Sequence, residues 1–428
     1  MGTALFLVFL IVLFIVGMPV GFSLGIASMV VMAGQRSGIK FGTIIQQMIG
    51  GVNTFTLLAV PLFLLAGKLM NLSGITDKLF HFARIVVGWL PGGLGHVNVL
   101  ASIIFAGMSG TAVSDASGLG VVEIKAMKDA GFDGGFSCSV TAASSTVGPI
   151  IPPSLPLVVY GTMSGASVGA LFIAGILPGL LMAAIMMVVV AIYAHLKSYP
   201  RDKFPTFKEF LSGLKDGFLP LMAPVIILLG IYTGLFTPTE AAAIVVFYSL
   251  LLGVVVYREL DWKTLHAVLK ETVSDAATIG LIVAGATLYG NVIIKAMIPQ
   301  TLLELVTSAI TSKYVMLFVI NIFLLVVGMF LETTSAITIL MPLLLPILNE
   351  MGIDLVHFGI IIVLNLMIGV LTPPFGIVLF VTSRIGDISI QGLTKALLPW
   401  LAALFFALML VTYIPQISLI MPQMAGLI

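Results

Sequence analysis

Two short breaks in otherwise apolar sequence contain the residues with the clearest chemistry. The first break, residues 145–154, has the sequence STVGPIIPPS, and the second, residues 369–374, has the sequence GVLTPP. Proline has no N–H group, so each proline in a helix frees the carbonyl four residues earlier. Glycine at a freed position lets a ligand approach the backbone closely. A cluster of carbonyl oxygens of this kind suits a hard cation such as Na⁺.

The two breaks free carbonyls at equivalent glycines. Pro152 frees the carbonyl of Gly148, and Pro373 frees the carbonyl of Gly369. A bare carbonyl at membrane depth is tolerated only where protein, water or an ion satisfies it. We therefore expect two Na⁺ sites, one at each break. The competing interpretation is a plain kink satisfied by serine or threonine hydroxyls, which explains one break more easily than two matched ones.

Two further segments concentrate polar side chains, SGTAVSD at residues 109–115 and FLETTS at residues 330–335. Asp115 is the strongest candidate ligand, because an ionised carboxylate inside a membrane is costly and by default marks a functional site. The alternatives for Asp115 are a buried protonated acid and an acid paired with a basic residue. The remaining candidates for the cation or for a substrate are Ser109, Thr111, Ser114, Ser154, Glu332, Thr333, Thr334 and Ser335.

The composition identifies the environment of these residues. The chain has 428 residues, 60% hydrophobic and 9% charged, with a mean hydropathy of +1.21. A soluble domain carries about 25% charged residues, and apolar runs of about 20 residues recur here. We therefore expect a polytopic α-helical protein in a lipid bilayer. A net charge of +1 gives no indication of nucleic-acid binding, and the single cysteine excludes a disulfide framework.

The chain also repeats itself with an offset of 221 residues (369 − 148 = 221). The matched pairs are Gly107 with Gly328, Gly148 with Gly369, and Pro152-Pro153 with Pro373-Pro374. Composition alone predicts about 0.1 occurrences of Gly-x-x-x-Pro-Pro, so two occurrences indicate an internal duplication. Ala336 stands 221 residues after Asp115. The second Na⁺ site is therefore expected to use neutral oxygens, with Thr372 as a side-chain ligand.

Both halves follow one order of elements. An amphipathic interfacial helix (residues 74–90 and 299–313) precedes two short apolar segments on either side of the polar tip. Segments of about 13 residues are too short to span a bilayer, so they predict a re-entrant helical hairpin (residues 96–127 and 314–348). A helix broken at the Gly/Pro motif and a spanning helix follow. Five crossings between the hairpins place them on opposite faces, which predicts inverted repeats.

The distribution of charge supports this topology. All but four of the 19 lysines and arginines fall on one side, and the exceptions are Arg36, Lys40, Lys295 and Lys313. The positive-inside rule makes the cationic side cytoplasmic. The sequence leaves open whether residues 3–32 cross the membrane once or twice, and on which side the chain begins.

Enzyme and channel functions are the competing classes. The Gly-x-Ser-Gly pattern at residues 107–110 matches rhomboid intramembrane proteases, in which Ser109 would be the nucleophile. None of the five histidines is placed at depth on a neighbouring spanning helix, so a serine protease is disfavoured. The chain has no phosphate-binding loop, which excludes ATP-driven pumping by this chain alone. A passive channel would not need two inverted hairpins, so a secondary transporter is favoured.

Four motifs resemble the large membrane subunit of tripartite ATP-independent periplasmic (TRAP) transporters. They are GMSGTAVSDASGLG, STVGPIIPPS, GLFTPTEAAA and GVLTPPFG, in this order between residues 107 and 376. The resemblance covers essentially the whole chain. It implies Na⁺-driven uptake of an organic acid anion across a bacterial inner membrane by an elevator motion. The chain is most similar to the sialic-acid branch, and C4-dicarboxylate transport is the main competitor.

The resemblance also implies ligands and partners. The first Na⁺ site would take Ser109, Asp115, Gly148, Pro152 and Pro153, and the second would take Gly328, Gly369, Thr372 and the carbonyl of Phe375. The substrate contacts proposed beside them are Thr111, Ser114, Ser154, Thr333 and Thr334. A small four-helix membrane subunit and a periplasmic substrate-binding protein would be the partners. A stand-alone Na⁺/anion symporter is the closest alternative.

The predicted fold is an all-α polytopic membrane protein with two inverted repeats, each with a re-entrant hairpin and a broken helix. Residues 1–73 and 166–297 are expected to form scaffold helices. Residues 74–165 and 298–386 are expected to form the two halves of a moving transport domain, in an elevator-type arrangement. Residues 387–428 are expected to form a C-terminal helix.

Overall fold

A computed structural model describes residues 3–34 and 41–428, without the side chains of residues 3–7, 15, 33–34, 41, 108–109 and 305–309. The described residues form helices and no β-strand. Seven helical segments in this part of the chain are long and apolar enough to cross a membrane: Phe55–Leu72, Val168–Lys197, Phe207–Tyr232, Pro238–Val256, Trp262–Lys295, Thr333–Glu350 and Ile390–Tyr413. The expected all-α polytopic fold is confirmed.

The first repeat has the predicted order of elements. Its helices are the arm α5 (Ile75–Val87), the hairpin α6 (Gly93–Ser109) and α7 (Ala112–Asp129), and the broken pair α8 (Gly134–Ser145) and α9 (Leu155–Ser164). Gly110 makes the turn of the hairpin with a φ of 61°, a conformation that favours glycine. Thr111 then caps α7 by accepting a hydrogen bond from the Ser114 amide. Both hairpin helices run a few residues beyond their predicted ends.

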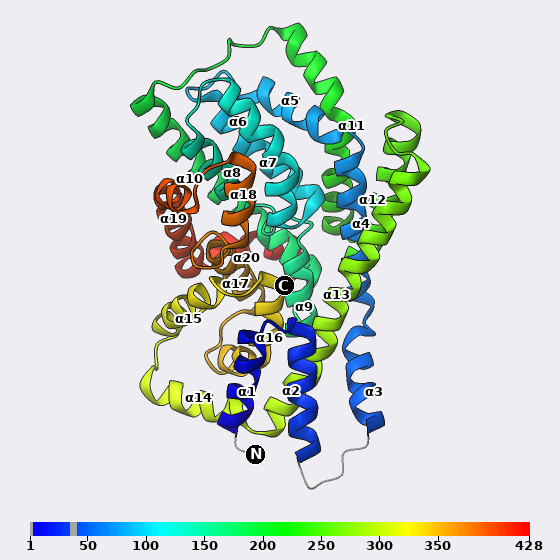
Figure 1. Cartoon of the computed structure of the whole chain (residues 1–428), viewed down its shortest axis with the longest axis vertical. Coiled ribbons are helices and arrows are strands. Elements are labelled where there is room, and N and C mark those ends of the chain that lie inside the picture. Colours follow the sequence, from blue (N-terminus) through cyan, green and yellow to red (C-terminus); the bar gives the residue numbers. More distant parts are fainter. Residues whose placement is uncertain (1–2, 35–40) are drawn as a thin grey trace.

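The second repeat matches the first. Its helices are the arm α14 (Ile298–Ala309), the hairpin α15 (Lys313–Gly328) and α16 (Thr333–Glu350), and the broken pair α17 (Leu355–Gly369) and α18 (Ile377–Gly386). Glu332 caps α16 by accepting from the Ser335 amide at 3.1 Å. The arms α5 and α14 lie toward opposite ends of the long axis of the molecule (Figure 1). This placement agrees with inverted repeats.

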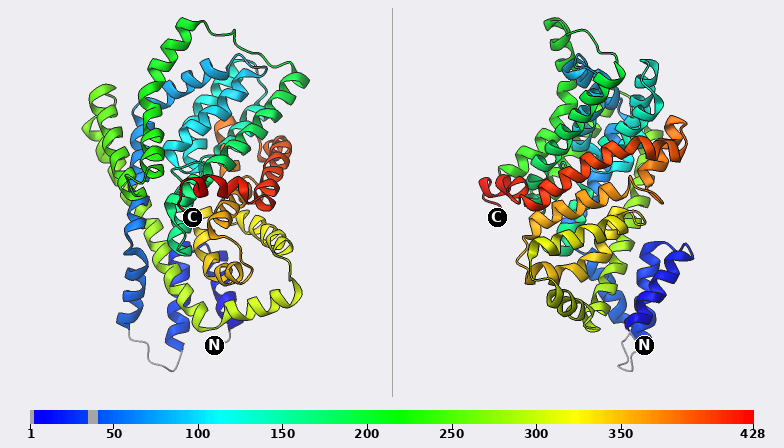
Figure 2. Two further views of the ribbon diagram at one scale, coloured as in Figure 1. Left: turned by 180° about the vertical axis from the view of Figure 1, so that it is seen from behind. Right: turned by 90° about the vertical axis from the view of Figure 1, so that its left-hand side faces the viewer.

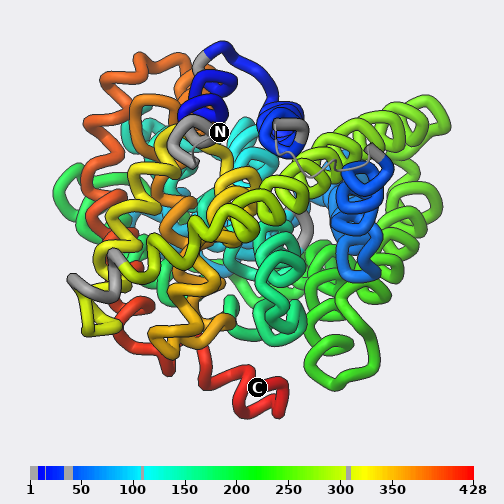
Figure 3. The backbone as a smooth tube through the Cα atoms, turned by 90° about the horizontal axis from the view of Figure 1, so that it is seen from below, coloured from blue at the N-terminus to red at the C-terminus, as the bar shows by residue number. Residues whose placement is uncertain are grey.

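The remaining helices surround the repeats. They are α1 (Thr3–Ile15), α2 (Val20–Gly34), α3 (Phe41–Val52), η1 (Phe55–Leu58), α4 (Ala59–Leu72), α10 (Val168–Lys197), α11 (Phe207–Tyr232), α12 (Pro238–Leu250), η2 (Leu251–Val256), α13 (Trp262–Lys295), α19 (Ile390–Tyr413) and α20 (Gln416–Met424). α19 and α20 pack on α10 across the middle of the molecule (Figure 2). α2 and α3 pack on α13 (Figure 3). α1 and α2 form a helix–turn–helix of 13 and 15 residues, each shorter than the roughly 20 residues of a spanning helix.

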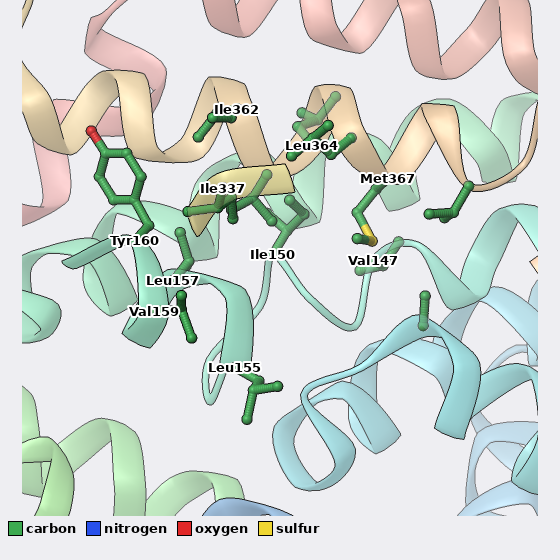
Figure 4. Close-up of a cluster of buried hydrophobic side chains, with 14 of the residues drawn as sticks. Val147, Ile150, Leu155, Leu157, Val159, Tyr160, Ile337, Ile362, Leu364 and Met367 are labelled. Atoms are coloured by element: carbon green, nitrogen blue, oxygen red, sulfur yellow. The ribbon is translucent and has the colours of Figure 1, made fainter. Parts of the chain in front are cut away.

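The two broken helices share an apolar core. Val147 and Ile150 of the first break gather with Leu364 and Met367 of α17 (Figure 4), and all four side chains are buried. The Tyr160 hydroxyl of α9 donates to the Leu355 carbonyl at the start of α17 at 2.6 Å. In a membrane, lipid tails are as apolar as these side chains, so helices associate through close van der Waals packing and interhelical hydrogen bonds. This core therefore holds the two breaks together.

Candidate functional site

The tip of the first hairpin touches the break between α8 and α9. The Leu155 amide donates to the Gly110 carbonyl at 3.4 Å. A Cβ atom on Gly110 would lie 2.7 Å from the carbonyl oxygen of Pro153, and one on Gly148 would lie 3.9 Å from the carbonyl oxygen of Thr111. Backbone oxygens of the tip and of the break therefore come together. The tip of the first hairpin therefore faces the broken helix of its own repeat.

The second hairpin meets its break through two glycines. A Cβ atom on Gly369 would lie 2.5 Å from the Cα and carbonyl carbon of Gly328, and one on Gly328 would lie 3.1 Å from the Cα of Gly369. Real Cβ atoms do not approach backbone this closely, so the crossing requires glycine. Beside it, the rings of Phe330 and Phe375 pack with their centroids 5.8 Å apart. The two glycines selected by the 221-residue offset are thus in contact.

Both tips and both breaks line one small cavity of about 40 Å³. Its lining residues are Thr111, Ala112, Val113, Pro149, Pro156, Glu332, Thr333, Thr334, Met367, Val370 and Ile377. Three predicted substrate contacts, Thr111, Thr333 and Thr334, are therefore brought together. Ligand pockets usually enclose about 300–1,000 Å³. A small-molecule ligand would need the tips to separate.

The other two predicted substrate contacts lie elsewhere. Ser114 lines a separate cavity of about 60 Å³, which Lys68 and Asp275 also line. Ser154 is fully buried, and its hydroxyl donates to the Pro149 carbonyl while it caps α9. The structure thus gives the Ser154 hydroxyl partners within its own break.

Asp115 lies in the first turn of α7, and its side chain is 1% exposed. Ser102 of α6 lies near it, and the Ser102 hydroxyl donates to Ser144 at 3.0 Å. The Oδ2 atom of Asp115 has no hydrogen-bond partner among the described residues. An ionised, bare carboxylate oxygen in the interior is costly unless a cation or a proton neutralises it. The residues at this tip therefore fit a hard cation. Ser109 ends α6, and its side chain lies outside the described part.

Some of the freed carbonyls have partners within the breaks. The Ser145 carbonyl accepts from the Gly148 amide at 3.3 Å, and the Gly369 carbonyl accepts from the Thr372 amide at 2.9 Å. The prediction of bare carbonyls is therefore wrong at these positions, because tight turns inside the breaks satisfy one lone pair of each oxygen. A carbonyl oxygen has a second lone pair, which leaves it able to bind a cation. The Thr372 hydroxyl donates to the Ile368 carbonyl at 2.8 Å and retains its own lone pairs.

Asn365 of α17 is a polar residue beside the second break that the sequence analysis missed. It is fully buried, and its Nδ2 atom donates to the side-chain oxygen of Asn321 at 2.7 Å. Its Oδ1 atom has no partner in the part of the chain that the structure describes. Asn365 precedes Gly369 by one turn and is the repeat equivalent of Ser144 (365 − 144 = 221). The same offset that matched the glycines would have identified it.

The core of the first hairpin also contains a polar network that the sequence analysis passed over. Hydrogen bonds among Asn98, Ser102, Thr141 and Ser144 join α6 to α8, and Glu123 of α7 lies beside them. All five side chains are buried. Glu123 was detectable in principle, because a carboxylate within an apolar hairpin helix is itself a functional signal.

The protease alternative can be tested on the same hairpin. His96 and Ser109 lie on one helix, 13 residues apart (109 − 96 = 13). This spacing corresponds to about 20 Å along an α-helix. His96 therefore lies far beyond hydrogen-bonding distance of Ser109 and is excluded as its general base.

Comparisons with known proteins agree with this architecture. The solved structure of the YdaH transporter of Alcanivorax borkumensis matches this chain with a TM-score of 0.56 at 14% sequence identity. The match covers 88% of this chain and 90% of that one, and it supports the fold alone. The chain is 46% identical over 409 residues to the sialic acid TRAP transporter large permease protein SiaM of Vibrio cholerae, covering 95% of each chain. It is 38% identical over 373 residues to the C4-dicarboxylate TRAP transporter large permease protein DctM of Pseudomonas aeruginosa, covering 87% of each chain.

These relatives are named as transporter permeases, and the protease alternative finds no support among them. The family described as the tripartite ATP-independent periplasmic transporter, DctM component, matches residues 7–417. That match includes both hairpins and both breaks. The chain therefore belongs to the DctM component family of tripartite ATP-independent periplasmic transporters.

Proposed function

We propose that this chain is the permease of a three-part system that imports an organic acid anion. Sialic acid is the favoured substrate and a C4-dicarboxylate the second candidate, because identity is 46% to the sialic-acid permease and 38% to the C4-dicarboxylate permease. A periplasmic binding protein would deliver the substrate, and a small four-helix membrane subunit would complete the carrier. The chain itself is a multi-pass protein of the bacterial inner membrane.

Na⁺ coupling is the second part of the proposal. The observation that carries it is Asp115, a buried carboxylate whose Oδ2 atom has no partner among the described residues and which lies beside a backbone break. When bound, Na⁺ supplies the positive charge that this carboxylate lacks. The backbone of the Gly148 break would complete the first site. The second site would use the neutral oxygens of Gly369 and Thr372, with Asn365 Oδ1 as an additional ligand.

The elevator arrangement is the third part. All residues that line the central cavity fall within residues 74–165 and 298–386, the two halves of the expected transport domain. Part of the boundary with the expected scaffold contains a cavity of about 480 Å³, between residues of α3 and α13 on one side and α14 and α16 on the other, whereas α10 packs closely on α6, α9 and α17. The cavity leaves room for one body to slide past the other at that part of the boundary.

Transport in proteoliposomes tests this function. We expect uptake of labelled sialic acid to need the binding protein, the small subunit and an inward Na⁺ gradient. Replacing external Na⁺ with choline should reduce uptake to background. Uptake by this chain alone would contradict the three-part system and favour the stand-alone symporter. Uptake of labelled succinate in place of sialic acid would transfer the substrate assignment to the C4-dicarboxylates.

A further inference from the structure

The segment between α10 and α11, residues 198–206, connects two groups of helices. It is the extended green segment at the top of Figure 1. α10 packs on α6, α8, α9 and α17, which belong to the site-bearing helices (α6–α9 and α15–α18), and on α19 and α20. α11 packs mainly on the arm α5 and on α12, and α12 packs on α4. Residues 198–206 therefore lead from helices packed around the candidate site to helices packed away from it.

Tyr199 attaches the start of this segment to the first repeat. Its hydroxyl donates a hydrogen bond to the Oδ2 atom of Asp133, the N-cap residue of α8. Its ring centroid lies 4.5 Å from that of Phe132 and 4.9 Å from that of Phe136. Aromatic pairs at such distances stabilise a contact beyond the area that they bury. Position 199 is therefore held to the helices that carry the candidate site.

Asp202, three residues further on (202 − 199 = 3), is attached to the arm α5 instead. Its carboxylate accepts two hydrogen bonds from the guanidinium of Arg84, from Nε at 2.7 Å and from Nη2 at 2.9 Å. Its backbone amide donates to the carbonyl of Gly88, just after the end of α5, at 3.0 Å. The ring of Phe204 packs against that of Trp89 with centroids 5.1 Å apart. These contacts hold the middle of the segment on the arm.

The Arg84–Asp202 ion pair is strong enough to bias an equilibrium and weak enough to open. The two side chains are 48% and 36% exposed. An exposed ion pair changes an equilibrium by up to about fivefold, and a bidentate arginine–carboxylate pair belongs to the upper part of that range. In the described part of the chain, neither residue has another ion-pair partner. The pair is therefore the electrostatic contact that holds this segment on α5.

The position of Asp202 limits how far the site-bearing helices can move. An extended chain covers at most about 3.6 Å per residue, so Tyr199 must stay within about 11 Å of a docked Asp202. When Asp202 is released, the next fixed residue is Thr206, which caps α11 together with Glu209. Seven residues separate it from Tyr199 (206 − 199 = 7), which allows about 25 Å. Opening the ion pair thus more than doubles the distance that the segment can span.

We propose that Arg84 and Asp202 are positioning residues that hold the site-bearing helices in the arrangement of this structure, and that their ion pair opens when these helices move. α10 moves together with the candidate site, and residues 198–206 are the connection that extends. The inference rests on the proposed elevator arrangement and assigns it a contact that has to break. Loss of the pair raises the population of other arrangements by about two- to fivefold.

A reversible cross-link tests whether the pair has to open. In Arg84→Cys/Asp202→Cys, a short bis-methanethiosulfonate reagent joins the two positions, and dithiothreitol releases them; the native Cys138 is buried. We expect uptake by the complete three-part system in proteoliposomes to fall to background after cross-linking and to return after reduction. The matched control is Lys208→Cys/Ser212→Cys, two exposed positions on α11 alone, and its uptake should not change. Full uptake by the cross-linked Arg84/Asp202 variant would overturn the proposal.

Spin-label distances test the same role without transport. Labels at Lys197→Cys on α10 and Lys208→Cys on α11 report the separation of the two helices by double electron–electron resonance. We expect a population at a different distance to grow about two- to fivefold in Asp202→Asn, and the reversed pair Arg84→Asp/Asp202→Arg to restore the original distribution. Identical distributions with Asp202 and with Asp202→Asn would overturn the positioning role. If wild type shows no uptake, the proposed function fails, while these distances still decide the positioning role.

Discussion

Gly369→Ala is expected to separate the second hairpin from its broken helix and to lower the free energy of unfolding by about 3 kcal/mol, the upper part of the usual range for overpacking. The added Cβ would lie 2.5 Å from the Cα and carbonyl carbon of Gly328. These neighbours are backbone atoms of α15, so no side-chain rotation relieves the clash. Gly328→Ala should be milder, because its Cβ would lie 3.1 Å from the nearest backbone atom.

The apparent melting temperature of the purified protein in detergent measures this effect. Gly280→Ala on α13 is the matched control, because nothing lies within 4 Å of its Cβ position. It makes the same chemical change in a helix, where alanine is favoured over glycine by up to about 1 kcal/mol. We therefore expect Gly280→Ala to melt at or above the wild-type temperature. If Gly369→Ala and Gly280→Ala have the same melting temperature, the glycine crossing is not tightly packed.

The features of the fold that the sequence predicted depend on local or periodic signals. Proline and glycine define a helix break wherever they occur in an apolar run, and the amphipathic pattern of residues 74–90 defines an interfacial arm. The 221-residue offset added a relation between distant positions. It selected Gly328 and Gly369 without any knowledge of packing, and the structure places their backbones in contact.

The features that the sequence did not predict depend on tertiary neighbours. Ser154 reads as a polar residue at a break, but the structure uses its hydroxyl to cap α9 and to satisfy the Pro149 carbonyl. In the second break, a local turn lets the Thr372 amide donate a hydrogen bond to the Gly369 carbonyl. The positions of the prolines do not predict this turn. The contact of Asn98 with Thr141 joins residues 43 positions apart on two helices. No local pattern encodes that pairing.

Of the buried acids in the first hairpin, one was predicted from the sequence and the other was not. Asp115 was identified because a carboxylate in a membrane hairpin is conspicuous whatever surrounds it. Glu123 carries the same signal, but it lies within the segment that was assigned as an apolar hairpin arm. The structure shows both to be buried acids with a bare oxygen atom among the described residues. The rule that identified the first acid therefore applies equally to the second.

Asp115→Ala is expected to abolish the share of Na⁺-specific stabilisation that comes from the first site. In wild type, one site saturated at 100 times its dissociation constant stabilises the folded protein by about 2.7 kcal/mol. Without the carboxylate, this site retains only neutral oxygens, and its contribution should fall to near zero. The second site does not use Asp115, so a weaker Na⁺ dependence should remain. The measurement is the melting temperature in NaCl against choline chloride at equal ionic strength.

The stability of Asp115→Ala relative to wild type without Na⁺ gives a second test of the same prediction. A buried carboxylate without a cation destabilises the fold, so Asp115→Ala should be at least as stable as wild type in choline chloride. Asp129→Ala is the matched control, because it removes the same charge from the exposed end of α7. It should keep the full Na⁺ dependence of wild type. If Asp115→Ala and Asp129→Ala respond equally to Na⁺, Asp115 is not a ligand, and the cation must be sought at the neutral oxygens around Gly369 and Asn365.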